Sequence, residues 1–542
     1  MNRDSIHSIT RRDLMRLLGI GGGAAIGAGL PGFEALAQSR KDTLVIGMDI
    51  RDTNNLDPVR DLHYTPPMTV HACYDTLLTM DPGDYITLKP ALATKWERTP
   101  DGKGWRFTLR DNVKFVTGNK MTAQDVKYSL DRVNYIGYQA AQYLTNVAEF
   151  KVVDEKTIDV MLKNPIEPIL TILAAPSFSI TDSKVVAEKG GDATPQSKDK
   201  DKATEWLNQN SVGTGPYKLV GWERGAQIQL VANPTYWGGK PPYQRVVIRH
   251  FEDSAAQLLS LRRGDIDAAF NLLPEQLTTL KDDKDLWIKE HDSLDFIYIA
   301  LTHNPEFNKA LAVKEARQAV AYAIDYDGII KNLLGGAGIR PPNFIPAGLL
   351  GATEQLTKEI GFREDLDRAK KLLAQAGFPD GFEFEIIYGN GAIAGTTYHV
   401  LGQKLQADLG RVGIKLKLNP MPQVNLRTLY NGGKMSATLV YWNPPAVENA
   451  LWSWATVQRV AKRLHWTPPA DLVKLVDDAA TETDPKKAEA LYIEYQKRMV
   501  DVANLIVLFQ PRYQVGVCKT IKDLPLTAAG WQLEVGGVKP SA

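Results

Sequence analysis

The chain has 542 residues, of which 44% are hydrophobic and 23% charged, an ordinary composition for a globular protein. This length exceeds one compact core, so we expect roughly two to four domains. The formal charge is +1 at pH 7, so there is no bulk electrostatic reason to bind nucleic acid or an anionic membrane.

The first forty residues have the layout of an export signal. The pair Arg11 and Arg12 precedes a weakly apolar run rich in glycine and alanine, and a small-residue cleavage motif ends at Ala37. The arginine pair favours the twin-arginine route, with residues 1–37 removed after Ala37. A retained membrane anchor is the alternative, but the apolar run is short and breaks at Pro31, whereas a span needs about 20 apolar residues.

The first half of the remaining chain predicts short strands and few long helices. Residues 42–50 are typical of a first buried strand, and residues 68–80 resemble a helix. Apolar residues alternate with polar ones in three further stretches, at 105–110, 157–163 and 227–233. We therefore expect a mixed α/β region with antiparallel strands over about 90–290. Its polar, charged stretch at 187–206 is interpreted as a surface excursion.

From about residue 300 helices alternate with strands. Residues 366–378 and 401–413 each place apolar side chains on one helical face, and both helices are predicted to end at a glycine. A strand with alternating apolar residues follows at 414–420, which favours a second α/β domain with a partly parallel sheet. Two apolar runs, 294–304 and 503–515, flank this region. If both cross between domains, they form a double hinge suited to closure on a ligand.

The sequence contains no recognisable catalytic or metal-binding motif. The nucleophile-elbow, zinc-protease, P-loop and C-x-x-C patterns are absent, and the eight histidines are scattered. We therefore predict a protein that is not an enzyme and uses no cofactor or metal. The two cysteines, Cys73 and Cys518, either form one disulfide or remain two buried thiols.

The stretch YWNPPAVENALWSW, residues 441–454, is the strongest binding signal. It holds four aromatic rings and two prolines, with Glu448 as its only charged residue. Aromatic rings with a polar edge suit ligand pockets, although core packing is the more common role of Trp452 and Trp454. We predict that Tyr441, Trp442 and Asn443 line a binding cleft.

Residues 92–133 and 212–251 resemble the characteristic blocks of family 5 extracytoplasmic solute-binding proteins, the dipeptide-, oligopeptide- and nickel-binding components of ABC importers. Further blocks follow in the family's order over essentially the whole chain after the signal. The resemblance implies an α/β fold of the periplasmic-binding-protein-like type II, with two lobes, a double hinge and an extra subdomain in the first lobe. It also implies a periplasmic substrate-binding component of an ABC transporter, which captures a small solute by hinge closure and delivers it to the membrane permease. The expected partners are the small solute and the ABC permease subunits, and the protein is expected to be a monomer.

The domain boundaries that follow are approximate. We expect residues 41–295 to form the first lobe, with the extra subdomain over about 90–205. Residues 296–507 should form the second lobe, and residues 508–542 should return to the first.

Peptide binders of this family carry an aspartate shortly after the tryptophan of the corresponding loop, where it pairs with the peptide's α-ammonium. Here prolines follow Asn443, and the aspartate is absent. An unpaired buried ammonium costs about 3–5 kcal/mol, so the loop favours a neutral or π-rich ligand, unless Glu448 or a first-lobe acid replaces the aspartate. A peptide remains the family's default ligand; oligosaccharides, opine-type or aromatic compounds and metal chelates are alternatives.

Four further residues, in loops that follow predicted strands, are predicted to contact the ligand. His303 and Asn304 follow the first crossing run. Asn55 and Tyr64 lie after the first strand, where cleft loops are usual.

Overall fold

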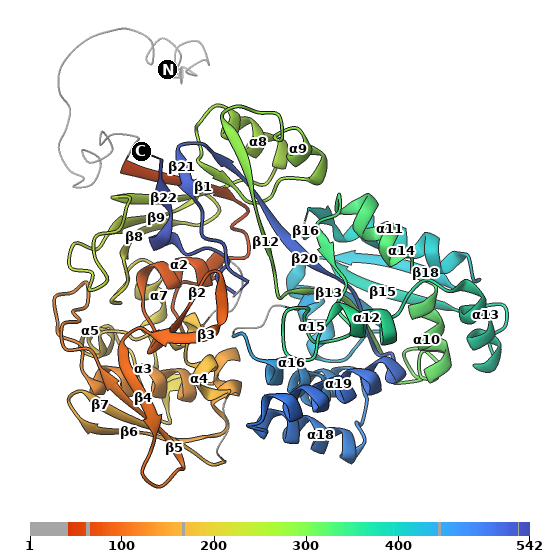
Figure 1. Cartoon of the computed structure of the whole chain (residues 1–542), viewed down its shortest axis with the longest axis horizontal. Helices are drawn as coiled ribbons and strands as arrows, with labels where there is room; N and C mark the ends of the chain where they lie inside the picture. The colour runs from red at the N-terminus through yellow and green to blue at the C-terminus, as the bar shows by residue number, and fades with distance from the viewer. Residues whose placement is uncertain are drawn as a thin grey trace, which may run out of the picture. The chain divides into compact units, whose positions relative to one another are not determined.

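The computed structural model describes residues 42–60, 65–164, 168–393, 395–442, 446–528 and 530–541. The predicted export signal, residues 1–37, lies outside the described residues. Residues from Thr43 onward form one unit, and Figure 1 shows two lobes in it. We call the part from β1 to β12, with the chain after the middle of β20, the first lobe. The part from β13 to the start of β20 is the second lobe.

One large sheet runs through both lobes. Its strand order is β18-β15-β19-β13-β20-β11-β1-β10-β9-β8, and β12 and β14 also pair with β20. The bounds are β18 (Lys415–Met421), β15 (Glu383–Gly389), β19 (Ala437–Trp442), β13 (Phe296–Leu301), β20 (Leu505–Cys518), β11 (Ala268–Ala269), β1 (Thr43–Met48), β10 (Arg245–His250), β9 (Gln227–Ala232), β8 (Tyr217–Glu223), β12 (Leu286–Asp292) and β14 (Gly338–Ile339). The predicted strands at 42–50, 227–233 and 414–420 are confirmed as β1, β9 and β18.

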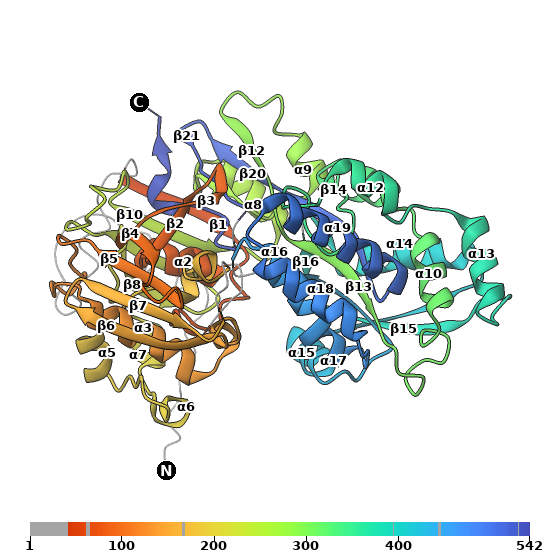
Figure 2. The ribbon, with the colours of Figure 1, turned by 60° about the horizontal axis from the view of Figure 1, so that its bottom comes forward.

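The first lobe adds a separate four-stranded antiparallel sheet, β4-β5-β7-β6, which lies next to helix α3 (Figure 2). Two of its strands were predicted from alternation, at 105–110 and 157–163. The elements of this lobe outside the large sheet are α2 (Thr65–Cys73), β2 (Leu78–Asp81), β3 (Asp84–Pro90), β4 (Ala93–Arg98), β5 (Gly104–Leu109), α3 (Ala123–Ile136), η3 (Gln139–Leu144), β6 (Val147–Asp154), β7 (Thr157–Leu162), α4 (Ile169–Ile172), η4 (Pro176–Phe178), α5 (Ser183–Glu188), α6 (Ser197–Lys200), α7 (Thr204–Leu207), α8 (Ser254–Arg262), α9 (Pro274–Thr278), β21 (Ile521–Asp523), η7 (Val535–Gly537) and β22 (Lys539–Pro540). The helix expected over 68–80 ends earlier, because the chain turns at Tyr74 and continues as strand β2.

The second lobe covers its part of the sheet with helices, and Figure 2 shows α18 and α19 side by side. The helices predicted at 366–378 and 401–413 are confirmed as α13 and α14, and β15 pairs in parallel with both β18 and β19. The remaining elements are α10 (Lys314–Tyr322), α11 (Tyr326–Gly328), η5 (Ile329–Leu333), α12 (Glu354–Ile360), α13 (Leu366–Gln375), β16 (Ala392–Ile393), β17 (Thr396–Thr397), α14 (Tyr398–Gly410), α15 (Gln423–Asn431), α16 (Asn449–Ala455), η6 (Thr456–Val460), α17 (Ala461–Arg463), α18 (Ala470–Thr481) and α19 (Pro485–Val502).

The chain crosses between the lobes at two adjacent places. The first crossing joins β12 to β13, and the second is the middle of β20, which pairs with β13 along its first part and with β12 along its second part. Side chains tie the crossings together: the Ser293 hydroxyl donates to the Pro511 carbonyl at 2.6 Å, and Gln510 Nε2 donates to the Ser293 carbonyl at 2.6 Å. Gln510 is fully buried. The two segments expected to cross thus lie side by side in the sheet.

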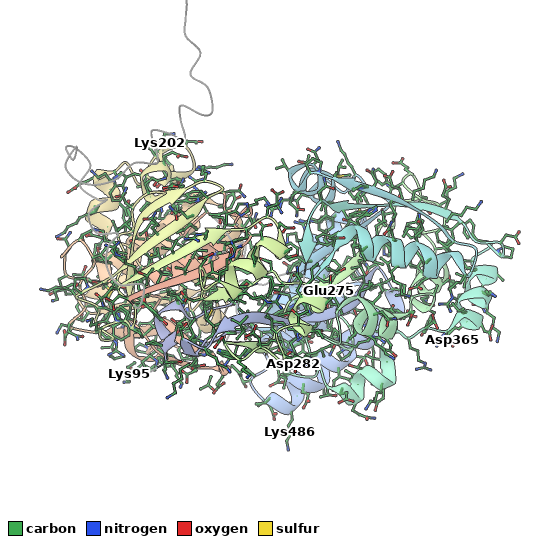
Figure 3. All side chains as sticks on the ribbon, turned by 90° about the horizontal axis from the view of Figure 1, so that it is seen from above. Lys95, Lys202, Glu275, Asp282, Asp365 and Lys486 are labelled. Atoms are coloured by element: carbon green, nitrogen blue, oxygen red, sulfur yellow. The ribbon has the colours of Figure 1, made fainter. Side chains whose placement is uncertain are left out.

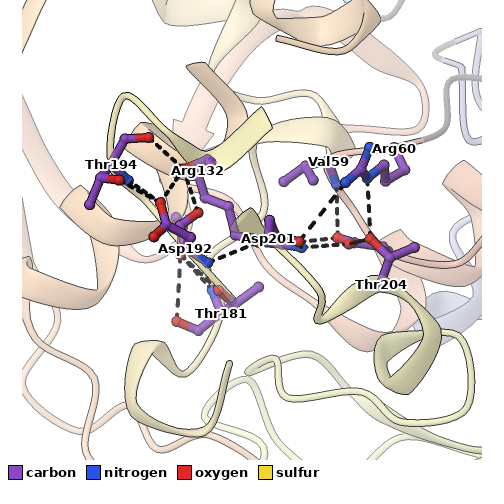
Figure 4. Close-up of polar contacts among 11 residues, drawn as sticks. Val59, Arg60, Arg132, Thr181, Asp192, Thr194, Asp201 and Thr204 are labelled. Carbon is purple, nitrogen blue, oxygen red and sulfur yellow. Dashed lines mark hydrogen bonds and ion pairs between the residues drawn. The ribbon is translucent and has the colours of Figure 1, made fainter. Parts of the chain in front are cut away.

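A buried ion cluster fixes helix α3 in the first lobe (Figure 4). Arg132 donates to both carboxylate oxygens of Asp57, at 2.7 and 2.6 Å, and to both of Asp201, at 2.8 and 3.0 Å. All three side chains are almost completely removed from solvent. Burial opposes ionisation of Asp57, but the charge of Arg132 and the hydrogen bonds that Asp57 accepts, from Arg132 first, together outweigh it and lower the pKa of that carboxyl.

Most of residues 187–206 are exposed, as expected of a surface excursion, but the ion cluster holds the stretch at one buried residue, Asp201. Lys202 does point outward (Figure 3), but its neighbour Asp201 lies inside the lobe and pairs with Arg132. Leu207, which follows directly, belongs to the core of the first lobe. The carboxylate of Asp201 therefore anchors the polar stretch. The sequence does not distinguish it from the other aspartates that alternate with lysines there.

The two cysteines are free thiols in the described structure, and both are buried. Cys73 packs in the first lobe's core, where burial raises its thiol pKa to about 12. Cys518 belongs to a different apolar cluster. The sequence left open one disulfide or two buried thiols, and the structure has two buried thiols.

Candidate ligand-binding site

A cavity of about 780 Å³ lies between the two lobes. Its first-lobe wall is the end of α3 with η3, and its second-lobe wall combines β19, α15 and the segment from η6 to α17. Cavities of this size typically hold small-molecule ligands. It is lined by residues of both lobes and is taken as the candidate site.

Helix α3 and the turn after it shape the first-lobe wall. Asp125 caps the start of α3: its carboxylate accepts from the Thr122 N–H at 2.8 Å and from the Thr122 hydroxyl at 2.9 Å. The helix ends at Gly137, whose φ of 68° is the left-handed conformation that glycine adopts without strain. The chain then turns into η3, which presents Gln142 and Tyr143 to the cavity.

The aromatic end of β19 forms part of the opposite wall. Trp442 is 7% exposed, and its ring meets Phe344 edge-on at 5.6 Å between centroids. Its indole Nε1 is buried and has no hydrogen-bond partner among the described residues. Since a buried N–H normally finds an acceptor, this nitrogen is available to one from a ligand.

Helix α15 contributes Tyr430 to the same wall. Its hydroxyl lies 3.0 Å from the hydroxyl of Tyr298 on β13, which fixes the ring against the sheet. The guanidinium of Arg463 lies over the Tyr430 ring, 4.6 Å from its centroid. The aromatic wall is therefore overlaid by a positive charge.

Arg459 is the central charged group of the cavity. It lies in η6, a π-helical turn between α16 and α17, and such turns are common at functional sites. Its guanidinium lies 5.0 Å from the centroid of Trp442, and its Nη1 donates to Oε1 of Gln142 at 2.7 Å. This hydrogen bond connects the second lobe with the first.

The described lining of the cavity is basic. It includes Arg427, Arg459 and Arg463, and it contains no aspartate or glutamate. Burial raises the pKa of Tyr143, while the charge of Arg459, its hydrogen bond to this tyrosine and the charge of Arg463 oppose the rise. The positive potential therefore extends from the second lobe to the first-lobe wall.

Two of the seven predicted ligand residues, Tyr441 and Trp442, line this cavity together. Asn443 and Tyr64 lie outside the described residues. Ligand contact of all seven stays a prediction.

The other three predicted residues lie away from the cavity lining. His303 and Asn304 follow the far end of β13, because Trp442 pairs with Phe296 at the opposite end of that antiparallel strand. The His303 ring stacks on Trp466 at 5.8 Å.

Local hydrogen bonds explain the positions of the two asparagines. Asn304 Oδ1 accepts from the Glu306 N–H at 3.0 Å, which closes a turn. Asn55 Oδ1 accepts from the Asp57 N–H at 3.0 Å, so it orients the loop that brings Asp57 to the ion cluster. Both side chains therefore have structural partners.

The remaining parts of the aromatic stretch are structural. The Glu448 side chain caps helix α16, where it accepts from the Ala450 N–H at 3.4 Å, and it is not part of the cavity lining. Trp452 is completely buried in the core, and Trp454 donates from its indole to Asp477 at 3.1 Å. Core packing, the alternative considered for this pair, accounts for Trp452.

Arg459 and Arg463 of the cavity lining were not predicted from the sequence. They are four residues apart, a spacing that places both on one helical face. They also follow the aromatic stretch within ten residues. That spacing was the available signal. The sequence alone does not show that the helix folds back over Trp442.

The described residues offer neither a metal site nor a membrane-spanning helix. They contain no group of three or more histidine, cysteine or acidic side chains arranged to hold a metal ion. They also contain no helix with the length and apolar character needed to span a membrane.

Comparison with known proteins gives consistent matches. The model of bacterial extracellular solute-binding proteins, family 5 Middle, matches residues 87–461. A probable D,D-dipeptide-binding periplasmic protein of Escherichia coli is 28% identical over 494 residues, which cover 89% of this chain and 91% of that protein.

Solved structures match the fold at lower identity. A dipeptide-binding protein of Pseudoalteromonas in complex with Met-Leu has a TM-score of 0.80 at 19% identity, over 92% of this chain and all of that chain (100%). A binding protein of A. tumefaciens in complex with agropinic acid has a TM-score of 0.75 at 22% identity, over 92% and 99% of the two chains.

These matches confirm the family resemblance and the predicted α/β binding-protein fold. The family is defined by solute binding, which agrees with the prediction that the chain is not an enzyme. Because the family model matches more than half of the sequence, the chain belongs to the bacterial extracellular solute-binding proteins of family 5.

Proposed function

We propose that this chain is the periplasmic substrate-binding component of an ABC importer. It captures a small solute between its lobes, closes about the double crossing and delivers the solute to the membrane permease. Closure needs no chemistry, because a ligand that contacts both lobes favours the closed state by those contacts.

The observation that carries this proposal is the cavity between the lobes. Gln142 from the first lobe and Arg459 from the second meet across it at 2.7 Å. Only the two adjacent crossings at Ser293 and Gln510 need to bend for the lobes to separate. Family membership and the periplasmic relative support the same role.

The proposal includes export and domain organisation. Residues 1–37 act as a twin-arginine signal that is cleaved after Ala37. Residues 41–295 and 508–542 form one moving lobe and residues 296–507 the other, and the protein works as a monomer. Tyr441, Trp442 and Asn443 contact the ligand.

The ligand is a peptide by family default. A non-peptide solute, such as an opine-type or aromatic compound, an oligosaccharide or a metal chelate, is the alternative. The alternative is favoured by the cavity itself, whose described lining has no carboxylate to pair with an α-ammonium.

The test is to express the full chain with its own signal, purify it from the periplasm and examine it by native mass spectrometry. We expect a mass that begins after Ala37 and a small molecule released on denaturation. A peptide and oligosaccharide panel then tests rebinding by thermal shift. A chain that releases no molecule and is not stabilised by any member of the panel would contradict the proposal.

A further inference from the structure

Two arginines of the cavity lie among neutral groups. Among the described residues, neither Arg459 nor Arg463 forms an ion pair with a carboxylate: Arg459 contacts Gln142 and Trp442, and Arg463 contacts Tyr430. Arginines elsewhere in the chain do form such pairs: Arg132 holds two aspartates and Arg106 holds Asp159. Arg459 and Arg463 thus bring positive charge to the cavity without a carboxylate in its described lining to compensate it.

The hydrogen bonding of Arg459 is also incomplete. Its Nη1 donates to a neutral amide, that of Gln142, and its Nε is buried without a hydrogen-bond partner among the described residues. Leaving a buried donor of a charged group unpaired is costly, so the site is set up for an acceptor that arrives with the ligand. A planar oxyanion satisfies a guanidinium edge best.

Aromatic rings hold both arginines in position. Arg459 lies over Trp442 and Arg463 over Tyr430, so both guanidinium groups are stacked on the wall. A guanidinium stacked in this way keeps its N–H edges free to meet a carboxylate. The indole Nε1 of Trp442, also buried and unpartnered, offers one more donor.

We propose that this cavity binds a small organic acid through its carboxylate, which Arg459 and Arg463 hold while the ligand's planar or apolar part packs on other aromatic and apolar side chains of the lining, such as Tyr143 and Tyr441. The ligand needs no free ammonium group. This inference rests on the proposed function, because it assigns the substrate class of the same cavity.

The experiment uses three matched compounds that differ in charge. N-acetylphenylalanine is an anion, phenylalanine amide a cation and phenylalanine a zwitterion, with the same ring in each. Binding to the purified full-length protein, freed of co-purified ligand, is measured by saturation-transfer NMR at millimolar concentration and by competition with that released ligand. We expect the anion to bind at least about tenfold more tightly than the cation, and added salt to weaken it.

The variants are Arg459→Gln and Arg463→Gln, separately and together, with Arg368→Gln as the control. Arg368 also stacks on a tyrosine, with its guanidinium 4.0 Å from the Tyr322 centroid, but it is not part of the cavity lining. The double variant should lose the preference for the anion, and the control should keep it. Circular dichroism and thermal unfolding check that each variant is folded.

The outcomes separate the two proposals. If the released ligand rebinds and Arg459→Gln leaves its affinity and the charge preference unchanged, the anion inference is overturned while the importer role stands. If the anion fails to bind or to compete although the released ligand rebinds, the inference is likewise overturned. If neither a released ligand nor any compound binds, both proposals are lost.

Discussion

Arg459 and Gln142 are 317 positions apart in the sequence and meet across the cavity, with Nη1 donating to Oε1 at 2.7 Å. The guanidinium of Arg459 also faces Trp442. One side chain therefore connects the lobes, covers the aromatic wall and carries the cavity's charge. Ligand affinity and lobe closure should respond together to changes at this contact.

Gln142→Ala removes the acceptor on the first lobe. A hydrogen bond to a charged group contributes about 1.5–3 kcal/mol, so the closed state should lose part of that, and affinity should fall by roughly tenfold. Calorimetry measures the affinity, and small-angle scattering measures closure. Gln227→Ala, on β9 away from the cavity, is the control, and equal affinities for both variants would contradict a role in closure.

Gln142→Glu separates the two effects. A carboxylate at this position pairs with Arg459 and strengthens the contact between the lobes, but it neutralises charge in the cavity. Scattering should show a more closed protein without ligand, while an anionic ligand binds more weakly than to the wild type. Tighter binding of an anion would contradict this expectation.

Trp442 should be tested by Trp442→Phe. Because Trp442 is 7% exposed and belongs to the core, replacement by alanine would cost about 3–5 kcal/mol of stability and confuse binding with folding. Phenylalanine keeps a ring but loses area and the indole N–H, so affinity should fall by about 1 kcal/mol, roughly fivefold. Trp454→Phe, outside the cavity lining, should leave calorimetric affinity unchanged.

The parts of the fold that sequence could predict are those with a local periodic pattern. Strands such as β5, β7 and β9 and helices such as α13 and α14 show their apolar faces within ten or so residues. The crossing segments could be found because strands buried on both faces are continuously apolar, as in β13. The arrangement of two lobes joined by a double hinge was implied by the family resemblance as well.

The candidate site could be predicted only in part, since its contacts join distant segments. Trp442 stood out by composition, but Arg459 sits on a later helix, and Gln142 on a turn of the other lobe. His303 and Asn304 were placed by their position after a crossing strand. The antiparallel pairing of β13 with β19 puts that strand end opposite to Trp442, and register of this kind cannot be read from one segment.

His303 gives a pH-dependent stability. Burial, followed by the charge of Arg317, lowers the pKa of His303 from its ordinary value near 6.5 to about 3. Below about pH 6.5 the unfolded chain therefore takes up a proton that the folded state does not. Stability from this residue is present above that pH and falls as pH drops, by up to about 1.4 kcal/mol per unit.

The measurement is urea unfolding at about pH 7 and 5, comparing wild type with His303→Phe, which can keep the stack on Trp466. The variant should lose less stability between these two pH values. His291→Phe, near the end of β12, serves as the control for an added ring. Parallel losses in wild type and His303→Phe would contradict the assignment.

Arg132→Met should destabilise the first lobe more than any surface charge replacement. The methionine fills similar space but leaves Asp57 and Asp201 buried without their counter-charge, which costs about 3–5 kcal/mol. Arg498→Met, on α19, removes an arginine from exposed pairs with Asp471 and Glu494 and should cost about 1 kcal/mol or less. Urea unfolding measures both. Arg132 lies on α3, whose end forms part of the cavity wall, so the folded fraction of Arg132→Met should also bind ligand more weakly. Equal stability of Arg132→Met and Arg498→Met would mean that the cluster does not hold α3 in place.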